Sequence, residues 1–186
     1  MKYIIKPAAV LFLTAVIVMA LLGVVHRLTI EPIERQRQRT REAAMRDVLP
    51  SADIFQKIFV ETPGSITAVH KGFSGDILAG IVTELSRRGY SGNIDLMVGI
   101  SLPDEKISGM RILRHTETPG LGALAVREDF FRRFDNRPLV PLGVTRASPL
   151  EHEIIAITGA TITTRAITEA VNEAIEWYLN QMRNEE

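Results

Sequence analysis

The sequence predicts an α+β domain with a mostly antiparallel sheet and packed helices, preceded by one N-terminal transmembrane helix. Three observations predict it: an uncharged apolar stretch near the start, short β-branched runs punctuated by glycines, and an amphipathic helical pattern near the end. They divide the chain of 186 residues into a membrane anchor at 1–28, a polar helical stalk at 29–50 and a folded domain at 51–186.

The anchor is predicted from the stretch between Ala8 and Val25, which carries no charge. A helix of this length spans about 27 Å, close to the thickness of the hydrocarbon core of a bilayer. A cleaved signal peptide is the alternative, although its apolar region is normally shorter, about 7–15 residues. More positive charges follow the stretch than precede it. This difference favours a cytoplasmic position for the segment after the stretch, but large domains translocate regardless of such charge. The charges are Lys2 and Lys6 before it, and Arg27, Arg35, Arg37, Arg39 and Arg41 after it.

The stalk is charged and rich in helix-forming residues, and we expect its helix to end near Pro50. Its arginines fit a solvated helix face, with contact to lipid headgroups as the alternative.

Beyond the stalk, short apolar and β-branched runs predict strands. They span 57–60, 66–70, 77–83, 94–100, 107–113 and 153–157. Turn residues at 103–106 join the fourth and fifth runs into a hairpin.

Two helical patterns follow the hairpin. A short amphipathic helix is predicted at 126–134, with Val126, Phe130, Phe131 and Phe134 on one face. Residues 135–150 are expected to be irregular or to contain a short strand. The clearest pattern predicts a helix from Thr163 to Met182, whose apolar residues recur three and four positions apart: Ala166, Ile167, Ala170, Val171, Ala174, Ile175 and Tyr178.

Composition excludes several function classes. The 22 basic and 22 acidic residues balance, so no overall field attracts nucleic acid. The absence of cysteine excludes disulfides and cysteine-ligated clusters. The histidines form no paired motif, so no metal site is expected. No nucleophile, base and acid are grouped in the sequence, so we expect no catalytic residue.

The segment Thr158-Gly159-Ala160-Thr161 joins the last predicted strand to the last predicted helix. First-turn N–H groups have no partner within a helix and mark the positive end of its dipole, so this position can hold a phosphate. Gly159 permits close backbone approach, Ala160 keeps the position narrow, and Thr161 offers a hydroxyl that a phosphate could esterify. A plain helix cap explains the same residues.

This segment and a second one, residues 115–122 with the sequence HTETPGLG, together resemble the FMN-binding domain family. Specifically, the chain resembles the G subunits of Rnf-type ion-translocating electron-transport complexes. The resemblance covers nearly the whole chain, including the N-terminal apolar stretch, the Gly89-Tyr90 pair and the hairpin at 94–113. The motif ETPGLG is the more specific of the two.

The resemblance implies that FMN is attached through its phosphate to Thr161, by a flavin transferase that uses FAD as donor. It also implies that the ETPGLG loop packs on the flavin ring. The cofactor-binding residues would then be Thr161, Thr158, Gly159, Ala160, Thr163, Glu117, Thr118, Pro119, Gly120, Leu121 and Gly122. For Thr163, and for Thr164 beside it, helix capping is favoured over phosphate contact, and for Tyr90 core packing is favoured over flavin contact.

The family's attachment motif usually carries an acidic residue six positions before the acceptor. This chain has Ile155 there, and Glu153 lies out of register. This departure weakens the expectation that the usual transferase modifies Thr161. It does not weaken the assignment of a flavin-binding domain.

The resemblance further implies an inner-membrane protein whose folded domain lies on the extracytosolic, periplasmic face. Its partners would be the other membrane subunits of a redox-driven ion pump linked to ferredoxin and NAD. The alternatives are the flavin subunit of a sodium-pumping quinone reductase and a stand-alone extracytosolic flavin carrier. A different class of protein, a non-redox membrane-anchored module that binds a lipid or cell-envelope ligand, is the remaining alternative.

Overall fold

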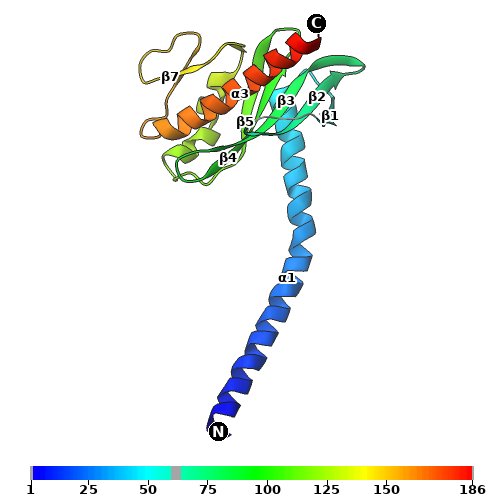
Figure 1. Ribbon diagram of the computed structural model, residues 1–186, viewed down its shortest axis with the longest axis vertical. Helices are drawn as coiled ribbons and strands as arrows, with labels where there is room; N and C mark the ends of the chain where they lie inside the picture. Colours follow the sequence, from blue (N-terminus) through cyan, green and yellow to red (C-terminus); the bar gives the residue numbers. More distant parts are fainter. Residues whose placement is uncertain (1, 60–63, 186) are drawn as a thin grey trace. The chain divides into compact units, whose positions relative to one another are not determined.

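The computed structural model describes residues 2–59 and 64–185, and the chain divides into two units between Arg41 and Glu42. Helix α1, Lys2–Val48, contributes to both units (Figure 1). From Ile5 to the end of the first unit its apolar side chains are exposed, and by length and composition it can cross a membrane. The helix ends within two residues of Pro50, as predicted. The boundary predicted at residue 28 falls inside this continuous helix and stays a prediction.

The second unit contains a six-stranded antiparallel sheet whose neighbouring strands follow one another in the chain. The first five strand runs predicted from the sequence overlap its first five strands, although residue 60 lies outside the described residues. The strands are β1 Ile54–Ile58, β2 Ile66–Ser74, β3 Ile77–Arg88, β4 Asn93–Ser101, β5 Lys106–Arg114 and β6 Arg137–Pro138.

Both faces of this sheet are covered, because alternate side chains of a strand point to opposite faces. On β4, the even-numbered apolar residues pack with helix α3, Thr161–Glu185, in one core cluster. Met97, between them, packs on the other face with Val48 and Leu49 at the end of α1. Figure 1 shows α3 lying across the sheet. The sheet is thus held between α3 and the last turn of α1.

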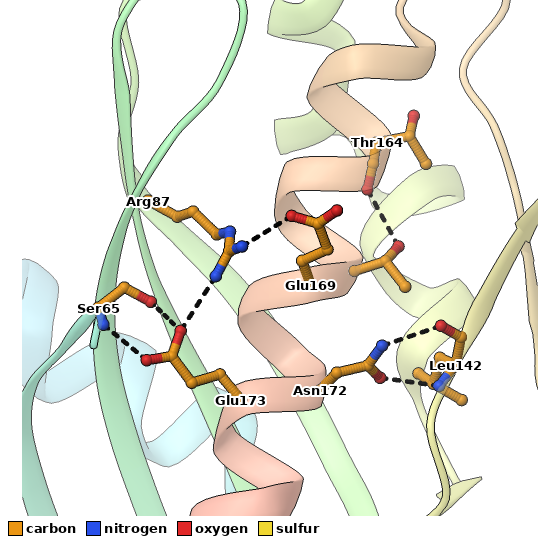
Figure 2. Close-up of polar contacts among 8 residues, drawn as sticks. Ser65, Arg87, Leu142, Thr164, Glu169, Asn172 and Glu173 are labelled. Carbon is orange, nitrogen blue, oxygen red and sulfur yellow. Dashed lines mark hydrogen bonds and ion pairs between the residues drawn. The ribbon is translucent and has the colours of Figure 1, made fainter. Parts of the chain in front are cut away.

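Polar contacts fix α3 against the rest of the unit (Figure 2). The Glu173 carboxylate accepts hydrogen bonds from the backbone and hydroxyl of Ser65 and from Arg87, the last at 3.1 Å. The Asn172 amide exchanges two hydrogen bonds with the backbone of Leu142, at 2.7 and 2.9 Å. These bonds set the position of the helix and therefore of its first turn.

The helix predicted at 126–134 is replaced by three short pieces: η1 Gly122–Val126, α2 Glu128–Phe131 and η2 Arg132–Phe134. Phe130 and Phe134 are buried and meet edge to face at 5.7 Å. The prediction that Val126 shares their face is wrong, since its side chain is 46% exposed. The reason is a break at Arg127, whose backbone is extended (φ −77°, ψ 147°).

The last predicted strand forms, but outside the main sheet. Strand β8, Glu153–Ile155, pairs in parallel with β7, Gly143–Thr145, in a separate two-stranded sheet. Helix α3 begins two residues before the predicted start, at Thr161.

Candidate functional site

The loop between β8 and α3 is a tight turn closed by a hydrogen bond from the Ala160 N–H to the Ile157 carbonyl, at 2.9 Å. Its third residue is Gly159, with φ +76°, a conformation that glycine adopts without steric cost. The Thr164 hydroxyl accepts a hydrogen bond from the Ile157 N–H and donates one to the Ala160 carbonyl. One side chain of the helix therefore fixes the loop that precedes it.

The ETPGLG loop is built in the same way. The Leu121 N–H donates to the Thr118 carbonyl at 3.2 Å, across a turn whose middle residues are Pro119 and Gly120. Gly120 has φ +76°, which is the conformation that a proline–glycine turn of type II requires. The turn directs Leu121 toward Gly159, where a Cβ would lie 2.9 Å from the Leu121 Cδ2 atom. The two predicted loops are therefore in contact.

The buried carboxylate of Glu117 connects these loops. One oxygen accepts a hydrogen bond from the Ser91 N–H at 2.9 Å, and the other accepts one from the Thr163 hydroxyl at 2.6 Å. Gly122 leaves room for the second bond, because a Cβ there would lie 2.4 Å from the Glu117 carboxylate. Glu117 thus ties the turn after β3, the ETPGLG loop and the first turn of α3 together.

A cavity of about 750 Å³ opens between the two loops. This volume lies in the range of cofactor sites. Polar groups of Thr158, Thr161 and Thr163 line it. Exposed apolar side chains line it as well: Tyr90, Leu121, Ile155 and Ile162. A flat aromatic ring and a phosphate both find suitable surroundings here.

Most of the predicted binding residues line this cavity, and two do not. Those that do are Thr158, Gly159, Ala160, Thr161, Thr163, Glu117, Thr118, Leu121 and Gly122. Pro119 and Gly120 are outside the lining; they form the turn that places Leu121.

Three side-chain expectations at the site are corrected. Tyr90 does not pack in the core: it is 67% exposed and lines the cavity, because it lies in the turn between β3 and β4. Thr163 and Thr164 do not cap α3, since both lie inside it, and their hydroxyls bond to Glu117 and to the loop backbone. The helix begins at Thr161, which leaves Ala160 as the residue whose carbonyl accepts the first helical bond.

Arg146 is a site residue that no sequence pattern indicated, and it lies in the irregular segment after β7. Its Nη2 atom donates a hydrogen bond to the Thr161 Oγ1 atom at 3.0 Å, and it also lines the cavity. Fifteen residues separate the two positions in the chain. Ile155, which stands where the attachment motif usually has an acidic residue, lines the same cavity and is 37% exposed.

Comparisons with known proteins agree with this geometry. Residues 89–176 match the FMN-binding domain family, and residues 1–48 match the RnfG N-terminal region. The G subunit of an ion-translocating oxidoreductase complex from Methanosarcina acetivorans is 30% identical over 92% of this chain and 95% of its own length. The G subunit of a Na(+)-translocating ferredoxin:NAD(+) oxidoreductase complex from Acetobacterium woodii is 32% identical over 96% of this chain and 93% of its own length.

The chain belongs to the RnfG family, the G subunits of Rnf-type ion-translocating oxidoreductase complexes. This RnfG protein is therefore part of a multi-subunit oxidoreductase complex, and its folded unit contains an FMN-binding domain. The FMN-binding match spans both loops of the cavity.

A solved structure shares the fold of this RnfG protein. It is the C subunit of the Na(+)-translocating NADH-quinone reductase from Parabacteroides distasonis. It superposes with a TM-score of 0.61, over 81% of this chain and 95% of its own, at 14% identity. At this identity the likeness concerns the α+β architecture alone.

Proposed function

We propose that this RnfG protein carries FMN joined to Thr161 by a phosphoester, and passes electrons through it to and from other subunits of a ferredoxin- and NAD-linked ion-translocating complex. The observation that carries the proposal is the position of the Thr161 hydroxyl. It stands at the start of α3, lines the cavity between the two loops, and is partly exposed to solvent.

The protein groups around the cavity have complementary tasks. The apolar side chains of Tyr90, Leu121, Ile155 and Ile162 offer surface for a flavin ring, and the threonines offer hydrogen bonds. Bound flavin supplies the redox chemistry, while the protein holds and orients it. A covalent tether keeps the cofactor in place even where its non-covalent affinity is modest.

The attachment exchanges the phosphoanhydride bond of FAD for a new phosphoester bond on Thr161, with AMP as the leaving group. The Thr161 oxygen forms a bond to the phosphorus on the flavin side of FAD, the bond to the AMP phosphate breaks, and the hydroxyl proton is released. A flavin transferase catalyses this step. The flavin is neither oxidised nor reduced during it.

The first test is the mass of the protein after expression with a flavin transferase. We expect the native chain to gain the mass of an FMN phosphoester and to fluoresce in a denaturing gel. Thr161→Ala should abolish both signals, because the acceptor oxygen is gone, and Thr161→Ser should keep them. Thr67→Ala, which removes an exposed hydroxyl of β2 that does not line the cavity, is the control and should remain flavinylated. Covalent flavin that persists in Thr161→Ala would refute the attachment site.

Ile155 bears on the extent of this modification. An acidic side chain at this position is usual in the family's motif, so we expect Ile155→Asp to raise the flavinylated fraction. An unchanged or lower fraction in Ile155→Asp would show that modification of this chain gains nothing from an acidic side chain at this position.

A further inference from the structure

The Arg146 guanidinium meets the candidate acceptor atom directly. Its Nη2 atom donates to the Thr161 Oγ1 atom at 3.0 Å, and both residues line the cavity between the loops. The Arg146 side chain reaches this position from the connection between β7 and β8, so it approaches α3 from outside the helix. Among the described residues, no carboxylate forms an ion pair with Arg146.

An arginine in this place suits a phosphate better than a hydroxyl. A guanidinium has five N–H donors in a planar fork that matches the oxygens of a phosphate, and only one of them is used by Thr161. The non-bridging oxygens of a phosphate on Oγ1 lie one bond beyond the phosphorus. They therefore fall within reach of the remaining donors.

We propose that Arg146 is the phosphate-binding residue of this site: it recognises the phosphate of the incoming flavin nucleotide and holds the finished phosphodiester at Thr161. The proposal rests on the proposed function, because it assumes that a flavin phosphate reaches Thr161.

The geometry before attachment is compatible with this role. A hydroxyl oxygen has two lone pairs and one hydrogen. Arg146 occupies one lone pair, which leaves the other free to bond to phosphorus and leaves the proton free to depart. The charge of Arg146 remains to neutralise the phosphate once the ester has formed.

The experiment compares purified, unmodified chains incubated with a flavin transferase and FAD. We expect Arg146→Gln to lower the rate of flavin attachment about tenfold, as for the loss of a charged hydrogen bond, and Arg146→Lys to recover part of it. Arg132→Gln is the control: this exposed arginine pairs with Glu128 on α2, away from the cavity, and its loss should leave the rate unchanged. Thermal unfolding of the unmodified variants checks that each is folded.

A second measurement separates phosphate binding from contact with the transferase. After long incubation, the phosphorus NMR resonance of the attached diester should move in Arg146→Gln and return toward the native position in Arg146→Lys. An unmoved resonance overturns the proposal, whether or not attachment is slower, because slower attachment alone would assign Arg146 to the transferase interface. Failure of the native chain to gain flavin would instead overturn the proposed function.

Discussion

At the scale of single residues, Glu117 shows how one side chain can hold a site together. Its two oxygens bond to groups 26 and 46 residues away in the sequence, the Ser91 N–H and the Thr163 hydroxyl. Because the carboxylate is buried, losing it would leave two donors without an acceptor. Glu117 is therefore a support of the cavity as well as part of its lining.

We expect Glu117→Ala to lower the free energy of unfolding by about 2–3 kcal/mol, the cost of leaving buried donors unpaired. Urea denaturation of the unmodified protein measures this. Glu117→Gln is the control and should lose less, because its amide oxygen still accepts one hydrogen bond. Equal unfolding midpoints for the native chain and Glu117→Ala would show that the bridge does not stabilise the fold.

Asp135, which follows η2, gives a pH-dependent prediction. Burial raises the pKa of its carboxyl above the ordinary value, an effect that the nearby Arg111 and Arg132 partly oppose. The folded state then holds this proton more tightly than the unfolded state. Stability from this group is therefore greatest at low pH and decreases as pH rises through the raised pKa.

Asp135→Asn removes that charge while keeping the shape of the side chain. At pH 7 we expect the Tm of Asp135→Asn to be slightly higher than that of the native chain. This difference in Tm should shrink once the pH falls below the ordinary pKa of an aspartate. Calorimetry at the two pH values measures both. A Tm at pH 7 below that of the native chain would mean that attraction to the arginines outweighs burial.

At the scale of elements, the last turn of α1 belongs to the folded unit. Val48 and Leu49 are completely buried in the core cluster on the sheet face opposite α3. The Ser108 hydroxyl of β5 donates a hydrogen bond to the Val48 carbonyl. The backbone approaches closely because β4 has a glycine, Gly99, at the contact: a Cβ there would lie 2.1 Å from the Val48 oxygen.

Gly99→Ala should therefore destabilise the protein by about 1–3 kcal/mol, as overpacking does in other cores. The expected loss of stability is opposite in sign to the usual effect of this substitution, since alanine is normally more favourable than glycine inside a strand. Ser108→Ala tests the same contact without adding volume and should cost about 1 kcal/mol. Chemical denaturation measures both changes in stability. A Gly99→Ala variant more stable than the native chain would show that the last turn of α1 can move away from β4 without cost.

At the scale of the whole molecule, the absence of cysteine makes the membrane topology measurable. The family resemblance implies that the folded unit is extracytosolic, whereas the arginines after the apolar stretch favour the opposite side. A single introduced cysteine can report which side each end of α1 occupies.

We expect Ser148→Cys, at an exposed position of the β7–β8 connection, to react with a membrane-impermeant maleimide in intact cells whose outer envelope has been made permeable. Lys2→Cys, on the other side of the apolar stretch, should react only after the inner membrane is disrupted. The reversed pattern would place the folded unit in the cytosol, and labelling of both positions in intact cells would mean that α1 does not span the membrane.

By itself, the sequence determined the elements of this protein, because helix and strand periodicity and turn residues act over a few neighbouring positions. The apolar stretch, the first five strands of the sheet and the last helix all follow from such local patterns. The TGAT and ETPGLG motifs likewise identified the two loops. Local patterns failed at Val126, where one extended residue, Arg127, breaks the helix.

Only the tertiary structure decided what meets at the cavity. The contact of Leu121 with Gly159, the bridge from Glu117 to Thr163, and the exposure of Tyr90 depend on how distant segments pack. Arg146 is the clearest case: it stands in an irregular segment with no motif, and only the course of the chain between β7 and α3 places its guanidinium on the Thr161 hydroxyl. Such contacts join residues far apart in the chain, so no local pattern in the sequence encodes them.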